Sequence, residues 1–420
     1  MATAISSVAE TCRAAKRAAM RLAQIDTARK DAALEAIAQA LNARSDEILT
    51  ANALDMQAGR ESDLSEALLD RLALDETRIE GIAHAVRQIV ALPDPVGEVI
   101  EGRRLPNGLD VRKIRVPLGV VAVVYEARPN VTIDAAALCL KSGNAIVLRG
   151  SSSAAHSNTA LAEIAADAAL RAGLPEGCIG LIGGSGREEL AKLASEADTV
   201  DLIIPRGGEG LKAALQAVAT VPVIYAASGN CHVYVDASAD LDQAQAIVLN
   251  AKTQRPGVCN AAETLLVHEA VAEAFLPRIV DELSGAGVSL RADTRTRQIV
   301  SPALPLATED DWATEYLALE MAVAVVDSLE GAIEHIARYG SGHSEAIVTR
   351  DTAAAGAFQL GVDAACVYVN ASTRFTDGGE FGMGAEIGNS TQKLHARGPI
   401  GLRELCTFKY LVQGEGHIRA

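Results

Sequence analysis

The chain has 420 residues, 49% of them hydrophobic and 3% aromatic, and a formal net charge of −16. So acidic a surface excludes general nucleic-acid binding, which needs a basic footprint. No apolar run approaches the roughly 18 residues of a membrane span, and the N-terminus has no signal-peptide pattern, so we expect a cytoplasmic protein with no membrane partner. The seven cysteines are odd in number and widely spaced, which fits neither a disulfide framework nor a metal site.

The first 92 residues differ in pattern from the segment that follows them. Apolar residues recur there at three- and four-residue spacing between charged ones, which predicts helices that end before Pro93 and Pro95. Residues 98–116 predict a two-stranded hairpin that turns at Asn107-Gly108. Its strands are charged and lack a clean apolar face, so we expect the hairpin to protrude and to pair with another subunit.

From residue 119 the chain alternates between strands and helices, which predicts βαβ units with parallel sheets. The predicted strands of the first series are 119–125, 144–148, 179–182, 200–204 and 221–225. After Asp236 the pattern restarts, with predicted strands 263–267, 322–326, 345–348 and 366–369. The fold class is therefore α/β with two parallel-sheet domains. We assign residues 1–97 and 117–248 to the first domain, 249–390 to the second, and 98–116 with 391–420 to the protruding part.

Cys259 is the strongest candidate for a catalytic side chain. It follows Pro256-Gly257 and precedes an apolar strand, so its thiol lies on a tight turn at the end of a rigid element. A thiolate on such a loop can be exposed and electrostatically activated. The alternative is a buried and inert cysteine, the commoner fate of a free thiol.

Two loops after predicted strands are candidates for binding a dinucleotide. Arg149-Gly150-Ser151 follows strand 144–148, and its amides, hydroxyls and guanidinium suit a ribose 2′-phosphate. A polar surface loop is the alternative. Gly207 and Gly208 follow strand 200–204 and open a helix, so the backbone there can approach a phosphate or a flat ligand. The usual G-x-G-x-x-G is missing, and its nearest match, at 184–189, is weak.

Two further polar loops are candidates for contacting a substrate. Asn130 follows strand 119–125 at the carboxyl edge of the predicted sheet, where its amide can donate to a developing oxyanion. Plain turn chemistry is the alternative. Arg374 follows strand 366–369 beside the hydroxyls of Ser372 and Thr373, which suits a carboxylate clamp. A surface loop is again the alternative.

Six sequence motifs are spread over nearly the whole chain. They are YEARPNVTID at 125–134, CLKSGN at 139–144, GNCHVYVD at 229–236, NAKTQRPGVCN at 250–260, YVNASTRFTDGG at 368–379 and STQKLHARGP at 390–399. In this order they resemble the aldehyde dehydrogenase superfamily and, within it, the γ-glutamyl phosphate reductase family. The resemblance implies that Cys259 is the nucleophile, Asn130 the oxyanion donor and Glu320 a ligand of the cofactor ribose.

The same resemblance implies an activity. It is the NADPH-dependent reduction of L-glutamate 5-phosphate to L-glutamate 5-semialdehyde through a thioacyl intermediate on Cys259, the second step of proline biosynthesis. A homo-oligomer is implied, and the glutamate 5-kinase that makes the substrate is a candidate partner. Hydrolytic superfamily members carry a glutamate base where this chain has Ala226–Asn230 without a carboxylate. Water is therefore poorly activated against a thioester.

Three other functions remain open from the sequence. The chain could be an aldehyde dehydrogenase that acts on another acyl substrate, a cysteine hydrolase that pairs Cys259 with a histidine such as His268, or a non-catalytic scaffold. The hydrolase leaves the dinucleotide-like half without a role, and the scaffold leaves the Cys259 loop without one.

Overall fold

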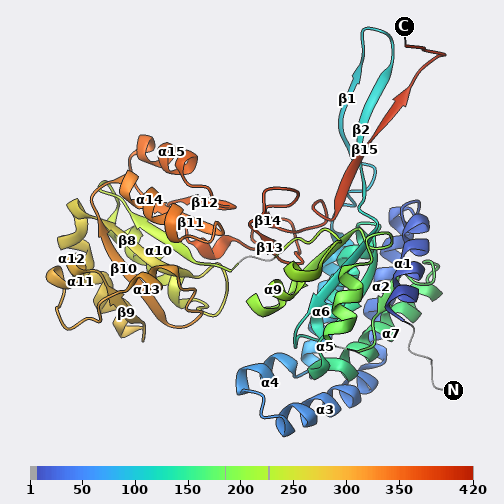
Figure 1. The fold of residues 1–420 in the computed structure, drawn as a ribbon, viewed down its shortest axis with the longest axis horizontal. Helices are drawn as coiled ribbons and strands as arrows, with labels where there is room; N and C mark the ends of the chain where they lie inside the picture. Colours follow the sequence, from blue (N-terminus) through green and yellow to red (C-terminus); the bar gives the residue numbers. More distant parts are fainter. Residues whose placement is uncertain (1–6, 185, 226–227, 420) are drawn as a thin grey trace. The chain divides into compact units, whose positions relative to one another are not determined.

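The chain folds into two compact units, each built around its own parallel sheet (Figure 1). The computed structural model describes residues 7–184, 186–225 and 228–419. Unit 1 is the chain up to Tyr225 together with Gly382–Gly388 and Ile400–Ala420, and unit 2 is Ala226–Phe381 with Asn389–Pro399. The division differs from the predicted boundary at residue 248. The reason is that β7 (Cys231–Val235) pairs with β8 (Ala262–His268) and β11 (Ser344–Val348), both strands of unit 2.

Unit 1 begins with the predicted helices. They are α1 (Val8–Leu22), α2 (Thr27–Ala43), α3 (Ser45–Glu61), α4 (Glu66–Leu72) and α5 (Glu76–Ala91). Ser7 and Glu10 form a reciprocal capping box at the start of α1, and Asp26 caps α2 by accepting from the Arg29 N–H. These caps satisfy the first backbone donors of each helix, which fixes where the helices start.

The sheet of unit 1 has the order β5-β4-β3-β6, and all its strands are parallel. The strands are β3 (Val120–Tyr125), β4 (Ala145–Arg149), β5 (Ile179–Leu181) and β6 (Leu202–Arg206), connected through α6 (Asn130–Lys141), η1 (Ser152–Ala154), α7 (Ala155–Arg171) and α8 (Arg187–Ala194), with α9 (Glu209–Val218) following β6. Every residue of β3 and β4 is buried, as expected of strands covered on both faces. The predicted strand at 221–225 is wrong. Only an isolated bridge between Ile203 and Val223 forms there, because Pro222 has no N–H for a ladder.

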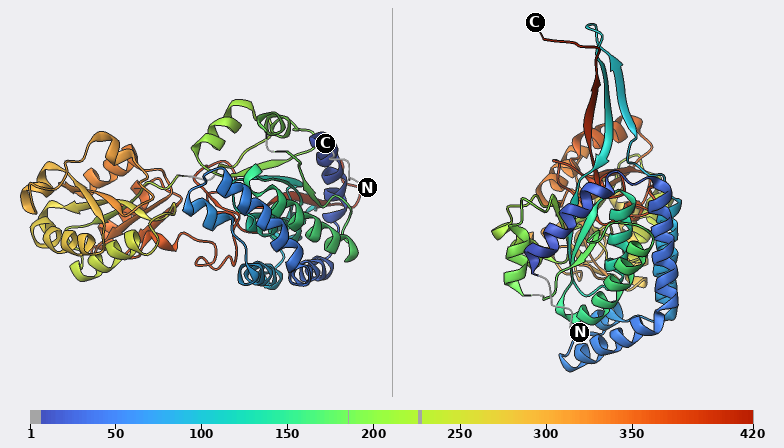
Figure 2. Two further views of the ribbon diagram at one scale, coloured as in Figure 1. Left: turned by 90° about the horizontal axis from the view of Figure 1, so that it is seen from below. Right: turned by 90° about the vertical axis from the view of Figure 1, so that its right-hand side faces the viewer.

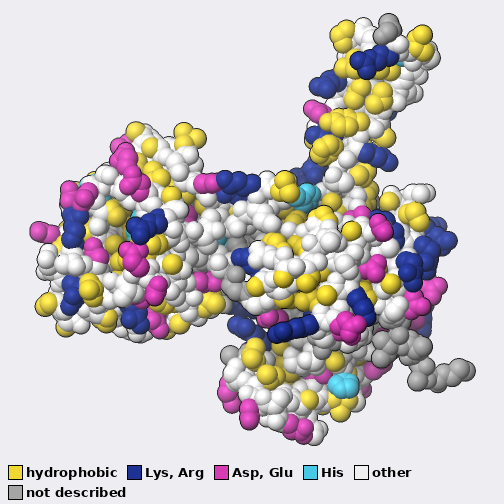
Figure 3. Space-filling model, viewed as in Figure 1, with side chains coloured by type: hydrophobic (Ala, Val, Ile, Leu, Met, Phe, Trp, Pro, Cys, Tyr) yellow, Lys and Arg dark blue, Asp and Glu magenta, His cyan; other side chains and the backbone are white. Residues whose placement is uncertain are grey.

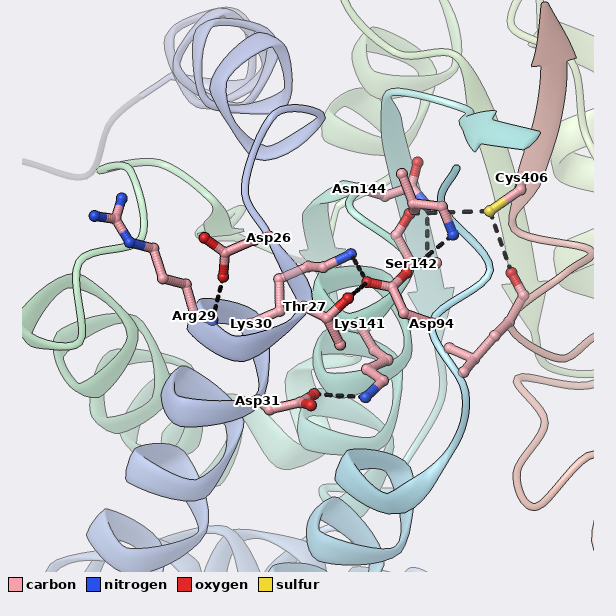
Figure 4. A network of polar contacts seen from close by, with 12 residues as sticks. Asp26, Thr27, Arg29, Lys30, Asp31, Asp94, Lys141, Ser142, Asn144 and Cys406 are labelled. Carbon is pink, nitrogen blue, oxygen red and sulfur yellow. Dashed lines mark hydrogen bonds and ion pairs between the residues drawn. The ribbon is translucent and has the colours of Figure 1, made fainter. Parts of the chain in front are cut away.

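A buried polar network ties the helical layer of unit 1 to its sheet (Figure 4). Lys30 forms an ion pair with Asp94, and Lys141 pairs with Asp31 at 2.5 Å; both lysine side chains are 1% exposed. The Asn144 amide donates to the carbonyl of Leu405 at 2.8 Å. That bond anchors the C-terminal segment beside the start of β4.

Three strands form an arm of unit 1 in the order β1-β2-β15, with both pairings antiparallel (Figure 2). β1 (Val99–Arg104) and β2 (Asp110–Pro117) confirm the predicted hairpin, and β15 (Cys406–Gln413) adds a third strand. Hydrophobic side chains are visible along the arm (Figure 3). Those that are exposed include Val99, Ile100, Phe408, Tyr410, Leu411 and Val412.

The sheet of unit 2 has the order β12-β11-β7-β8-β10-β9, again with all strands parallel. Its remaining strands are β9 (Ser289–Ala292), β10 (Glu320–Val326) and β12 (Cys366–Val369), and its helices are α10 (Leu241–Thr253), α11 (Glu269–Gly285), α12 (Thr294–Ile299), α13 (Glu309–Ala313), α14 (Leu329–Tyr339) and α15 (Thr352–Gly361). The short helix η2 (Thr373–Phe375) follows β12, and β13 (Asn389–Ser390) pairs with β14 (Gly398–Pro399). In the part of the chain that the structure describes, no helix combines the length and apolarity needed to cross a membrane.

Candidate active site

The candidate residues of unit 1 lie together at one edge of its sheet. Because the four strands are parallel, their carboxyl ends meet at the same edge. Asn130 follows β3, Arg149–Ser151 ends and follows β4, and Gly207–Gly208 follows β6. Asn130 thus lies at the carboxyl edge of a parallel sheet, as predicted, and the other two loops lie at the same edge.

Arg149 is the last residue of β4 and is buried, with 7% of its surface exposed. Its Nη2 donates to the carbonyl of Gly186 at 2.9 Å, and Gly186 is the N-cap residue of α8. Burial lowers the pKa of Arg149, and the nearby Glu189 carboxylate opposes that shift. Arg149 therefore links the ends of two neighbouring segments at the predicted phosphate site.

The three glycines of this edge, Gly150, Gly207 and Gly208, differ in how much space their surroundings leave for a side chain. A Cβ on Gly150 would lie 2.0 Å from the side-chain nitrogen of Asn158, and one on Gly207 would lie 2.8 Å from the carboxyl group of Glu126. Neighbouring side chains would thus have to shift to admit a Cβ at either position. A Cβ on Gly208, by contrast, would meet nothing within 4 Å, and Gly208 is the N-cap residue of α9. Of these three glycines, Gly208 is the one that leaves open space beside a helix N-terminus.

Asn130 is the first residue of α6 rather than part of a longer loop. Its amide nitrogen donates to Asp134 Oδ2 at 2.9 Å, one helical turn further on. Burial raises the pKa of Asp134 to about 6, while the bond from Asn130 and the charge of Arg206 oppose the rise. The side chain of Asn130 is therefore held in one orientation, with a second amide N–H left for another acceptor.

In unit 2, Cys259 lies just before the amino end of β8, which is a central strand of the sheet. Among the seven cysteines, all of which the structure describes, Cys259 is half-buried and the other six are buried. Burial raises the pKa of Cys178 to about 11 and those of Cys12 and Cys406 to about 12, so these thiols stay protonated. The inert alternative fits those three cysteines, and the partly exposed position of Cys259 suits a nucleophile.

Tight backbone contacts hold the Cys259 turn in place. A Cβ on Gly229 would lie 1.5 Å from the carbonyl oxygen of Cys259, so position 229 admits only glycine. The same carbonyl accepts from Cys231 Sγ at 3.2 Å. On the other side, the Asn260 amide donates to the carbonyl of Thr376 at 2.9 Å, and the Thr373 hydroxyl donates to the carbonyl of Asn260 at 2.7 Å.

The predicted substrate loop of unit 2 is thus joined to the Cys259 turn. Arg374 is partly exposed, and its Nε donates to Gln254 Oε1 at 2.8 Å. Burial lowers the pKa of Arg374, as does Arg255, whereas the Cys259 thiolate would raise it. Ser372 and Thr373 are buried and contact backbone groups, Ser372 by capping η2. Arg374 is therefore the member of this trio that suits contact with a ligand.

Glu320 is the first residue of β10, at the same amino edge of the sheet as Cys259. It forms an ion pair with Arg291, with an Nη2 to Oε2 distance of 3.4 Å, and its side chain is 37% exposed. Its role as a ribose ligand stays a prediction.

The structure excludes a dyad of Cys259 and His268. Cys259 precedes the amino end of β8 and His268 is its last residue. A strand of seven residues separates its two ends by roughly 20 Å, far beyond a hydrogen bond. The Nδ1 of His268 instead accepts from the Ala270 N–H at 3.0 Å, which caps α11. The cysteine hydrolase with this histidine is thus wrong.

Sequence reasoning missed three charged residues around the Cys259 turn. Lys252 Nζ and Glu263 Oε2 form an ion pair at 2.5 Å, with both side chains fully buried. Glu315 Oε1 accepts from the Gly229 N–H at 2.6 Å. Lys252 and Glu263 flank Cys259 in the sequence, so their nearness to the thiol was the one signal that could have drawn attention to them. No such signal marks Glu315, which lies far along the chain. In the described ranges, no group of three or more His, Cys, Asp or Glu residues could hold a metal ion.

Comparisons with known proteins agree on one family. The model of the aldehyde dehydrogenase family matches residues 2–303. A γ-glutamyl phosphate reductase from Thermobifida fusca is 58% identical over 96% of this chain and 97% of its own length, and one from Moorella thermoacetica is 59% identical with the same coverage. Among solved structures, γ-glutamyl phosphate reductase from Thermotoga maritima is 47% identical, with a TM-score of 0.97 over 99% of this chain and 100% of that one.

A structure with much lower sequence identity has the same fold. An acetylating aldehyde dehydrogenase from Geobacillus thermoglucosidasius is 21% identical, with a TM-score of 0.69 over 98% of this chain and 97% of that one. The α/β architecture with two parallel sheets is thus that of aldehyde dehydrogenases. The chain is an oxidoreductase that belongs to the aldehyde dehydrogenase family and, within it, to the γ-glutamyl phosphate reductases.

Proposed function

We propose that this enzyme reduces L-glutamate 5-phosphate to L-glutamate 5-semialdehyde with NADPH and releases phosphate, the second step of proline biosynthesis. The observation that carries the proposal is the half-buried thiol of Cys259 on a turn fixed by Gly229 and Asn260. The names of relatives 58% and 59% identical over nearly the full length support the substrate.

The carboxyl edge of the unit 1 sheet fits a phosphate-bearing dinucleotide. Gly208 leaves open space at the start of α9, and a helix N-terminus favours a phosphate. The Ser151 hydroxyl, which bonds to that of Ser153 at 2.7 Å, and the guanidinium of Arg149 add donors. A guanidinium pairs well with a 2′-phosphate, which favours NADPH over NADH. NADPH, when bound, supplies the hydride of the reduction.

The protein's own part in the reaction centres on Cys259. Its thiolate attacks the acyl carbon, a carbon–sulfur bond forms, and the bond from that carbon to the phosphate oxygen breaks. The backbone N–H of Cys259 donates to the oxyanion, and the resemblance to the family implies the Asn130 amide as a second donor. Arg374 binds the α-carboxylate of the glutamyl group through its guanidinium. No carboxylate occurs among Ala226–Asn230, which protects the thioacyl group from water.

The proposal is tested by running the reaction backwards. Purified enzyme is given glutamate 5-semialdehyde and NADP⁺, with and without inorganic phosphate, and NADPH absorbance is followed. We expect turnover that depends on phosphate. Equal steady-state turnover without phosphate would indicate a hydrolytic aldehyde dehydrogenase, and turnover only with another acyl acceptor would indicate a different substrate.

We also propose that the arm formed by β1, β2 and β15 joins copies of this chain. Its exposed Val99, Phe408, Tyr410 and Val412 are 47–58% exposed, and β1 and β15 leave strand edges open. Deletion of residues 101–112 should lower the molar mass measured by light scattering. An unchanged mass would refute this role. Direct transfer of the substrate from a glutamate 5-kinase stays a prediction.

A further inference from the structure

The turn that carries Cys259 is closed at its base by a buried ion pair. Lys252 lies in the last turn of α10 and Glu263 is the second residue of β8, so the pair encloses residues 253–262. The distance from Lys252 Nζ to Glu263 Oε2 is 2.5 Å, and both side chains are 0% exposed. The two ends of the nucleophile turn are therefore joined by one charged contact.

The second oxygen of Glu263 extends this contact to another segment. Glu263 Oε1 accepts from the Leu317 N–H at 3.3 Å. Two residues earlier, Glu315 Oε1 accepts from the Gly229 N–H at 2.6 Å, and the Cα of Gly229 lies directly against the Cys259 carbonyl. The contacts thus form a closed circuit, from the base of the turn through residues 315–317 and back to Cys259 itself.

Stability alone does not explain a fully buried pair at this place. Removing two charges from water costs several kcal/mol, and apolar residues of similar volume are often as stable or more so. Burial raises the pKa of Glu263 to about 7 and lowers that of Lys252, which reflects this cost. A pair retained against that cost, at the base of a nucleophile turn, has its explanation in the geometry it imposes.

We propose that Lys252 and Glu263 are positioning residues that hold Cys259 in its reactive orientation, an inference that rests on the proposed function of Cys259. Their ion pair fixes the two ends of the turn. The bond from the Leu317 N–H to Glu263 also holds the segment whose Glu315 accepts from the Gly229 N–H, and Gly229 packs against the Cys259 carbonyl. Losing the pair should slow the chemical step with little change in substrate binding, because misplacing a reacting group by about 1 Å can cost up to about 10²-fold in rate.

Two variants and a control test this proposal. Glu263→Gln keeps the size of the side chain and loses its charge. The double variant Lys252→Met with Glu263→Leu replaces the pair by apolar residues, which should keep the fold even if the single variant does not. The control is Lys141→Met in unit 1, which breaks the ion pair between Lys141 and Asp31. The Lys141 side chain is 1% exposed, so it is about as buried as Lys252, and it lies far from Cys259 in the sequence.

Two measurements are made on each variant. One is the rate of alkylation of Cys259 by iodoacetamide, read at its peptide by mass spectrometry over a range of pH; it needs no substrate. The other is the pair of constants kcat and KM with glutamate 5-semialdehyde, NADP⁺ and phosphate. We expect both pair variants to lose about tenfold or more in kcat, to keep KM within about twofold, and to show an altered pH profile of alkylation. Lys141→Met should lower Tm and leave kcat and alkylation unchanged.

The outcomes separate the two claims. If the double variant folds and keeps the wild-type kcat and alkylation profile, the positioning role is wrong. It is also wrong if Lys141→Met changes both readouts as much as the pair variants do. If alkylation changes in the pair variants while the wild-type enzyme shows no phosphate-dependent turnover, the positioning role stands and the proposed substrate is wrong.

Discussion

The candidate residues of the two units lie at different ends of their own strands: at the carboxyl ends in unit 1 and at the amino ends in unit 2. In unit 1, Asn130, Arg149 and Gly208 lie at the carboxyl ends of parallel strands, where ligands of open α/β sheets usually bind. In unit 2, Cys259 and Glu320 lie at the amino ends of β8 and β10. The general rule for parallel sheets therefore leads to the proposed nucleotide site in unit 1. It would have missed the proposed nucleophile in unit 2, which is indicated by its own turn and sequence motif.

Replacing the nucleophile should have the largest effect. Cys259→Ala should lower turnover by several orders of magnitude, since no other thiol in the described chain is exposed to take its place. The fold should persist, because the Cys259 contacts that hold the turn use its backbone carbonyl. Turnover is compared with that of a matched variant, Cys178→Ala, in which a buried cysteine is removed. Retention of more than about a hundredth of wild-type activity would contradict covalent catalysis.

At the carboxyl edge of unit 1, Asn130→Ala should lower kcat by roughly 10²-fold, the usual worth of one oxyanion donor. Cofactor affinity, measured by NADPH fluorescence titration, should change little. Asn130→Asp keeps the shape without the N–H donors and should be equally impaired. Normal turnover in both variants would mean that Asn130 only starts α6 and bonds to Asp134.

In unit 1, Arg149 is the side chain proposed to select NADPH over NADH. Arg149→Ala should raise KM for NADPH much more than KM for NADH, because a 2′-hydroxyl cannot replace the bidentate bonds of a 2′-phosphate. Its bond to the Gly186 carbonyl would also be lost, and that loss affects both cofactors alike. The ratio of the two KM values therefore isolates the phosphate contact. An equal rise for both cofactors would limit Arg149 to linking β4 with α8.

The smallest effect concerns pH and stability. The folded pKa of Asp134 is about 6 against an ordinary 3.8, so the folded state binds this proton more tightly than the unfolded state. The contribution of Asp134 to stability should therefore fall as pH rises from 4 to 6, and Asp134→Asn should escape that loss. Urea unfolding at pH 4 and pH 7 should show the variant gaining about 1–2 kcal/mol relative to wild type. A difference that does not vary with pH would contradict the raised pKa.

Much of the fold could be predicted because its strands are apolar runs bounded by glycine and proline. β3, β4, β8, β10, β11 and β12 match their predicted positions within a few residues. The errors have local causes. β7 begins with Cys231-His232, and its polar residues interrupt the apolar pattern from which a strand is predicted. In the fold, the His232 ring is hydrogen-bonded to the buried Glu345 carboxyl group. The predicted boundary at residue 248 differs from the observed one for the same reason, since β7 belongs to the sheet of unit 2.

The candidate site could be predicted only where a motif marked it. Cys259, Asn130 and Arg374 stand in motifs that carry their chemistry, and the structure gives each a defined setting. The supporting residues could not be found in this way. Glu315 reaches Gly229 from 86 positions away in the sequence, and Lys252 meets Glu263 only because α10 and β8 lie together in the fold. Contacts of this kind depend on tertiary structure and leave no local pattern.

Covalent catalysis by Cys259 is tested most sharply by looking for the acyl group on its sulfur. Enzyme is mixed with glutamate 5-semialdehyde and NADP⁺ without phosphate, quenched in acid, and its peptides are analysed by mass spectrometry. A glutamyl adduct should accumulate on the Cys259 peptide and then disappear when phosphate is added. NADPH formation with no adduct on Cys259, or with an adduct on another residue, would contradict covalent catalysis by Cys259.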